Sequence, residues 1–116
     1  MAGTPVSAGR LKELVAFSKP LTIPDGAGGE ETNWSEFYAC AAEFIYMRGS
    51  EAIEAARLTG TATYKIRIHK SAVACVITPD FKMRDVRRGT VYNLREVDGI
   101  TDLRWIYIIA ESGVAV

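Results

Sequence analysis

The side chains best suited to nucleophilic or metal chemistry in this sequence of 116 residues are one histidine, His69, and two cysteines, Cys40 and Cys75. A cysteine beside a histidine can act as a thiolate nucleophile, but nothing in the spacing of these residues brings them together. The spacing also lacks the Cys/His clusters of a zinc site. We interpret His69 as part of a solvated strand face and both cysteines as small buried apolar residues. We predict no catalytic residue, no metal and no cofactor.

A second candidate is the stretch Pro24–Thr32, which carries Asp25, Glu30 and Glu31 among glycines. Carboxylates bind hard cations, but this stretch lacks the regular ligand spacing of a calcium loop. It also lacks the lysine and the following helix of a phosphate-binding loop. We therefore predict a mobile, solvated hairpin loop, whose acids are candidates for docking a partner.

A third candidate is the basic cluster of Arg84, Arg87 and Arg88. Two interpretations stay open: a solvated turn, or a patch that meets the acids of a partner or a phosphate backbone. The 14 basic and 14 acidic residues give a formal net charge of zero, which argues against a general nucleic-acid-binding surface. The sequence has no apolar run of membrane-spanning length and no signal-peptide core, so we expect a cytosolic protein with reduced cysteines.

The hydrophobic pattern predicts a scaffold made mainly of strands. Tyr64–His69 gives the clearest signal, because apolar and charged residues alternate along it. A bend or bulge is expected near Ala41-Ala42, Pro20 ends a strand or marks an edge, and Asp98-Gly99 predicts a two-residue hairpin turn. The predicted strands cover residues 14–20, 33–47, 64–69, 81–86, 91–97 and 103–111.

A short helix over residues 51–58, capped by Ser50, is too short to be stable alone and is expected to dock on the sheet. The fold class is therefore mainly β, a small antiparallel barrel or sandwich of about six strands with one short helix. We expect a flexible N-terminal arm over residues 1–9, one domain over residues 10–112 and a C-terminal tail over residues 113–116.

The segment Lys70–Asp80 contains six apolar residues in a row, AVACVI. One interpretation is a buried strand, which the β-branched residues suit. The other, which the flanking turn residues favour, is a loop that becomes ordered against a neighbouring subunit or reaches toward a channel. The candidate interface or channel residues of this loop are Lys70, Ser71, Val73, Val76 and Ile77.

Nearly the whole chain, from about residue 8 to residue 111, resembles the phage head–tail joining proteins, also called head–tail adaptors, connectors or stoppers. Each motif is weak by itself, but their order and spacing agree with the family. The chain departs from it at Cys40-Ala41-Ala42, where a Trp-Ala pair is common, and at His69-Lys70, where an aromatic-basic pair is common. The matching motifs are AGRLKELVAFSKP from Ala8, then Trp34, Arg48-Gly49-Ser50-Glu51, Tyr64–Ile68, Thr78-Pro79-Asp80, Met83-Arg84 and Gly89–Leu94.

The resemblance implies a structural virion protein and no enzyme. Such a protein forms a homo-oligomeric ring, a dodecamer by analogy, at the head–tail junction of a phage, prophage or gene transfer agent particle. The expected partners are the portal or an adaptor above the ring and the tail terminator or tail tube below it. DNA passes through the channel without sequence-specific binding, no membrane is involved, and assembly takes place in the bacterial host cytoplasm.

The alternative is a small β-barrel binding module, of the oligonucleotide-binding or SH3-like kind, in a bacterial complex. Exposed aromatic residues and a basic groove on one sheet face would favour it.

Overall fold

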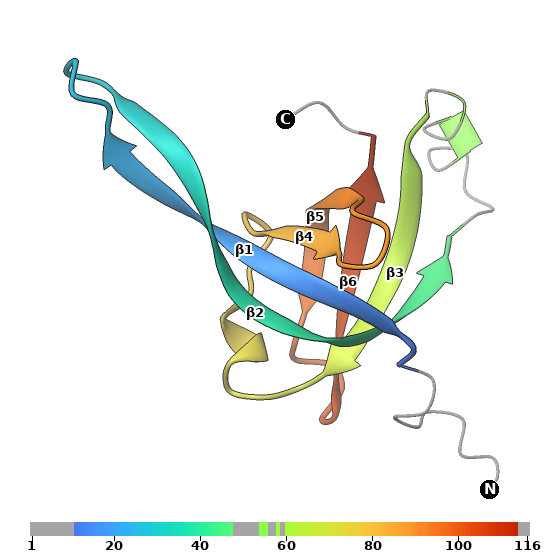
Figure 1. Cartoon of the computed structure of the whole chain (residues 1–116). Coiled ribbons are helices and arrows are strands. Elements are labelled where there is room, and N and C mark those ends of the chain that lie inside the picture. Colours follow the sequence, from blue (N-terminus) through green and yellow to red (C-terminus); the bar gives the residue numbers. More distant parts are fainter. Residues whose placement is uncertain (1–10, 48–53, 56–57, 59, 114–116) are drawn as a thin grey trace, which may run out of the picture.

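The computed structural model describes residues 11–47, 54–55, 58 and 60–113. The predicted six-strand, mainly β fold is confirmed: the strands form one closed antiparallel barrel in the order β1-β2-β3-β6-β5-β4 (Figure 1). The barrel closes because β1 pairs with β4 as well as with β2. The elements are β1 (Glu13–Pro24), β2 (Glu30–Tyr46), β3 (Ala62–His69), a 3-10 turn (Ala74–Val76), β4 (Lys82–Asp85), β5 (Val91–Asp98) and β6 (Trp105–Ser112).

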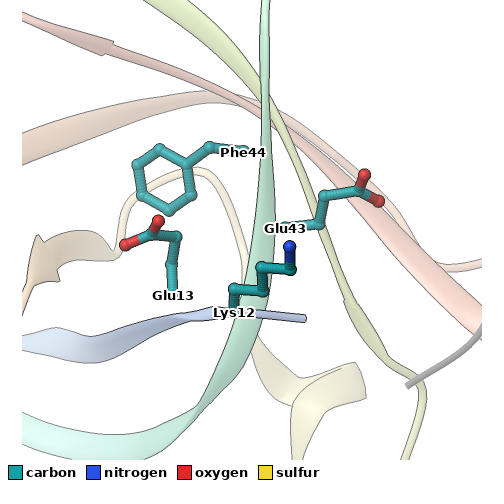
Figure 2. A pocket seen from close by; sticks show the side chains of 4 residues that line it. All are labelled: Lys12, Glu13, Glu43 and Phe44. Atoms are coloured by element: carbon teal, nitrogen blue, oxygen red, sulfur yellow. The ribbon is translucent and has the colours of Figure 1, made fainter. Parts of the chain in front are cut away.

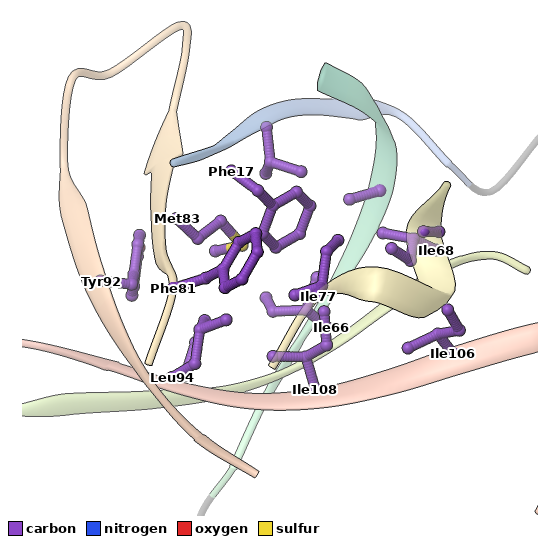
Figure 3. Close-up of a cluster of buried hydrophobic side chains, with 14 residues drawn as sticks. Phe17, Ile66, Ile68, Ile77, Phe81, Met83, Tyr92, Leu94, Ile106 and Ile108 are labelled. Atoms are coloured by element: carbon purple, nitrogen blue, oxygen red, sulfur yellow. The ribbon is translucent and has the colours of Figure 1, made fainter. Parts of the chain in front are cut away.

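The core follows from strand alternation. In β3, Ile66 and Ile68 are fully buried, whereas the neighbouring residue Lys65 lies on the outer face of the barrel. β6 lies between β3 and β5; its inward residues Ile106, Ile108 and Ala110 are fully buried, and the residues that alternate with them are buried or partly buried. The buried side chains from every strand meet inside the barrel (Figure 3). The largest side chains that are fully buried are Phe17, Ile66, Ile68, Met83, Ile106 and Ile108.

The β1–β2 hairpin is longer than predicted and projects from the barrel (Figure 1). β1 continues past Pro20 to Pro24, but it contacts β4 only over Val15–Ser18, so Pro20 marks an edge. The predicted loop over residues 24–32 is reduced to residues 25–29. Asp25 Oδ1 closes this turn by accepting hydrogen bonds from the N–H groups of Ala27 and Gly29 at 2.8 and 3.1 Å.

Two local predictions, a bulge at Ala41-Ala42 and a two-residue turn at Asp98-Gly99, are wrong. The register irregularity between β1 and β2 lies opposite Phe17/Ser18, where Phe37 is the extra residue, and the register is continuous through Ala41-Ala42. Asp98-Gly99 does not form a two-residue turn, because β6 begins only at Trp105. Asp98 Oδ1 instead accepts hydrogen bonds from the N–H groups of Ile100 and Thr101, both at 3.0 Å, and this supports a longer loop.

Most of the predicted helix and the N-terminal arm lie outside the described residues. Within the helix, Glu54, Ala55 and Leu58 have helical backbone and are exposed, Leu58 at 89%. At these residues the structure does not show the expected docking on the sheet.

Candidate functional site

The β4–β5 turn is built around a buried carboxylate, Asp85. Its Oδ1 accepts hydrogen bonds from the N–H groups of Arg87 and Arg88 at 3.1 and 3.2 Å, and its Oδ2 accepts one from Arg88 Nη1 at 2.8 Å. Burial alone would raise the pKa of Asp85, but these hydrogen bonds and the Arg88 charge outweigh it and hold that pKa below its ordinary value of 3.8. The carboxylate is therefore ionised at neutral pH and fixes the turn.

The predicted basic cluster is neutralised within the chain. Arg88 also donates to Glu13 Oε1 at 2.8 Å, and Arg84 pairs with Glu36 at 3.3 Å. Arg87 donates to the backbone oxygen of Lys12. The side chains of all three arginines remain about half exposed. The structure thus separates Arg84, on the outer face of β4, from Arg87 and Arg88 in the turn.

One mouth of the barrel carries two adjoining hollows that share Glu13 and Phe44. The first, of about 340 Å³, is lined by these two residues with Lys12 and Glu43 (Figure 2). The second, of about 220 Å³, adds the Asp85–Arg88 pair and the rings of Tyr64 and Tyr92. The three rings pack with centroids 5.4 to 6.0 Å apart. The side chains around these hollows are held in place by ion pairs and by the packing of the aromatic rings.

A separate groove of about 240 Å³ lies where the hairpin leaves the barrel. Lys82 Nζ sits 4.4 Å from the centroid of the Trp34 ring, which is a favourable cation–π distance. Trp34 and Val91 are 40% and 46% exposed. The lining residues are Ser18, Trp34, Lys82, Met83, Arg84 and Val91; we call this site the base groove.

The segment after β3 is a loop with a 3-10 turn, so the buried-strand interpretation is wrong and the loop interpretation holds for its local structure. Residues three apart share a side of a 3-10 turn. Ala74 and Ile77 therefore both enter the core, while Val73 and Val76 are 46% and 52% exposed. The apolar run thus divides into an anchoring side and an exposed side.

The remaining candidates of this loop lie at its start. The N–H of Lys70 donates to the Arg104 carbonyl at 2.8 Å, and Lys70 Nζ donates to the Asp102 carbonyl at 3.3 Å. Ser71 Oγ accepts a hydrogen bond from the Ala74 N–H at 3.0 Å. The two Lys70 bonds join the β3–β4 loop to the β5–β6 loop, so Lys70 is already held by its own subunit.

Two exposed apolar side chains were missed by sequence reasoning. Ile100 and Leu103, in the β5–β6 loop, are 89% and 91% exposed. The expected short turn at Asp98-Gly99 placed Leu103 at the start of a strand. A signal was present, since both are large apolar residues within a stretch of turn-forming residues.

The predicted solvated strand face around His69 is partly wrong. Arg67 is only 5% exposed, because its guanidinium lies 4.6 Å from the Trp105 ring centroid and pairs with Glu43 at 2.5 Å. His69 itself is exposed and stacks on Trp105, with ring centroids 4.4 Å apart. Among the described residues, no group of His, Cys, Asp and Glu side chains is arranged to hold a metal ion.

A family model for phage head completion proteins matches residues 6–113 of the sequence. The chain belongs to this family. The predicted kinship with head–tail joining proteins is thereby confirmed, and the protein is a phage structural head–tail component. A search of the curated proteins found no significant match.

Two solved structures share the fold of this head completion protein. One is a chain in the virion of a native gene transfer agent particle, with a TM-score of 0.61 and 17% identity over 90% of this chain and 96% of that chain. The other is the solution structure of protein SF1141 from Shigella flexneri 2a, with a TM-score of 0.68 and 16% identity over 96% of this chain and 100% of that chain. In the described part of the chain, no helix has the length and apolarity needed to cross a membrane.

The two cysteines of the head completion protein differ, which corrects the prediction that both are buried. Cys40 is partly buried, whereas Cys75 is exposed in the 3-10 turn. Burial raises the pKa of the Cys40 thiol to about 11. Because the thiolate is the reactive form, we expect a maleimide at pH 7 to label Cys75 more than about tenfold faster than Cys40. Mass spectrometry of the Cys40→Ala and Cys75→Ser variants measures each rate, and equal rates would contradict this assignment.

Proposed function

We propose that this protein is a head–tail connector, an adaptor or stopper that forms a ring between the portal and the tail. The observation that carries the proposal is the family match, which spans almost the entire chain. The presence of a chain with the same fold in a gene transfer agent virion supports it. Both favour a connector over an oligonucleotide-binding or SH3-like module.

The surface of the subunit suits an assembly protein. Closed rings of identical copies use two different patches on each subunit, one meeting the other on the next copy. The hairpin projects from one side of the barrel (Figure 1), and large apolar side chains are exposed both there and in the β5–β6 loop. Exposed apolar side chains of this size are unfavourable in water, and assembly into a ring would bury them against neighbouring subunits, the portal or the tail.

The proposed ring would also form part of the DNA channel. The ring extends the DNA path out of the head, and the zero formal charge of the subunit allows DNA to pass without being held. The β3–β4 loop, with exposed Val73 and Val76, is the proposed contact to a neighbouring subunit or to the channel. The acidic hairpin loop and the outward-facing arginines of the β4–β5 turn are proposed contact regions for other subunits.

Removing the gene from a cell that produces the particle tests this role. We expect DNA-filled heads and complete tails to accumulate separately in electron micrographs, and a plasmid copy of the gene to restore joined particles. Normal numbers of joined particles without the protein would contradict the proposal.

A further inference from the structure

The outer half of the β1–β2 hairpin has a one-sided charge. Between Pro20 and Ser35 the chain carries three acids, Asp25, Glu30 and Glu31, and no lysine or arginine. Every residue from 21 to 34 is exposed. Asp25 uses its carboxylate to close the turn, but Glu30 and Glu31 have no ion-pair partner among the described residues. We call residues 21–33 the hairpin tip.

The hairpin tip lacks the packing that would hold it in isolation. Beyond Ser18, β1 pairs only with β2, so the projecting part is a two-stranded ribbon. Such a ribbon is marginally stable in water unless it packs on something else. Leu21 and Ile23 are 41% and 37% exposed on it. The tip therefore exposes apolar side chains and lacks packing of its own, as expected for a segment that a partner holds in place.

The partner does not bind by adding a strand to the β1 edge. Pro20 and Pro24 both lie in the projecting part of β1 and have no N–H to donate to a new strand. Prolines of this kind protect an edge against pairing with another chain. We therefore base the contact on the side chains and the turn of the tip, which need a complementary pocket.

The base groove offers that complement. Its apolar surface comes from Trp34, Val91 and Met83, and its cations are Lys82 and Arg84. The nearby acid is Glu36, which pairs with Arg84 at 3.3 Å. Among the described residues Lys82 forms no ion pair, and its ammonium group lies over the Trp34 ring. A groove with surplus positive charge and an apolar wall fits a tip with exposed Leu21 and Ile23 and surplus negative charge.

A subunit does not fill its own base groove. Trp34 and Glu30 lie in the same strand, β2, four residues apart, which places them about 13 Å apart along an extended chain. The pairing of Ile23 with Glu31 and of Pro20 with Trp34 continues the hairpin outward from the groove, so the ribbon does not fold back on it. The tip therefore points away from the groove beside it and is available to another molecule.

We propose that the hairpin tip of one subunit docks in the base groove of the next copy. Glu30 and Glu31 then meet Lys82 and Arg84, while Leu21 and Ile23 cover the exposed Trp34 and Val91. The contact joins two different patches, so repeating it around an axis produces a ring. This inference rests on the proposed ring assembly and names the surfaces that form it.

Charge reversal tests the contact. The tip variant carries Glu30→Lys and Glu31→Lys, and the groove variant carries Lys82→Glu and Arg84→Glu. Each alone places like charges in every contact, so we expect the fraction of subunits in assemblies, measured by mass photometry with and without the portal, to fall about tenfold or more. An equimolar mixture of the two variants makes every contact complementary again and should assemble like the wild type.

Glu96→Lys is the matched control, because Glu96 is exposed on β5 and does not line the base groove; this variant should assemble normally. Circular dichroism of each variant confirms folding. If the wild type assembles and both reversed variants assemble equally well, or if the tip variant loses only portal binding, the docking is wrong and the proposed function stands. If the wild type forms no assembly even on its portal, both fail.

Discussion

Replacing Phe17 with alanine is expected to lower the free energy of unfolding by about 3–5 kcal/mol. Phe17 is completely buried, and it lies opposite Met83 where β1 and β4 close the barrel. It also adjoins the register shift between β1 and β2. The truncation removes apolar contacts from the seam and leaves a cavity that the barrel cannot fill without breaking strand pairing. Urea denaturation followed by tryptophan fluorescence measures the loss.

Leu21→Ala is the matched control on the same strand. Leu21 belongs to the projecting hairpin and is 41% exposed, so its truncation is expected to change the free energy of unfolding by less than about 0.5 kcal/mol. A similar loss for Phe17→Ala and Leu21→Ala would show that β1 does not divide into a barrel half and a projecting half.

Replacing Asp85 with alanine is expected to cost about 3 kcal/mol of folding free energy. The Asp85 side chain is 1% exposed, and its removal leaves the N–H groups of Arg87 and Arg88 without their acceptor. Thermal and urea unfolding at pH 7 measure the change. Asp98→Ala serves as control: it also removes an acceptor of two N–H groups, but water reaches this loop and the loss should be smaller.

The ionisation of Asp85 makes the free energy of unfolding depend on pH. Its folded pKa lies below the ordinary value of 3.8, so it stabilises the fold fully above that value and loses this contribution as the pH falls through the folded pKa. The free energy of unfolding of the wild type should therefore fall more steeply below pH 3.8 than that of Asp85→Asn. Parallel curves for the two proteins would contradict the assigned role of the carboxylate.

The strands could be predicted because each is a local pattern. The alternation in Tyr64–His69 and the apolar run of the last strand both lead to the observed β3 and β6. The barrel closure could not be predicted in the same way, because β1 and β4 are far apart in the sequence and their pairing is decided by the whole sheet. The hairpin was predicted too short because the glycines and acidic residues of the stretch Pro24–Thr32 indicated a loop.

The candidate surfaces were predicted less well, and the reason is again distance along the chain. Arg84, Arg87 and Arg88 form a cluster in the sequence, but their partners Glu13 and Glu36 come from β1 and β2. Only the closed barrel brings these acids to the arginines. In the β3–β4 loop the signal was present in the sequence. The buried residues Ala74 and Ile77 are three apart, and so are the exposed residues Val73 and Val76, as expected for the two sides of a 3-10 turn.

The most direct test of the connector role is the mass and shape of the complex that the purified protein forms with the portal of the same particle. We expect mass photometry to give a discrete complex containing a fixed number of copies, and electron microscopy to show a ring coaxial with the portal channel. A protein that stays monomeric and does not bind the portal at micromolar concentration would contradict the account.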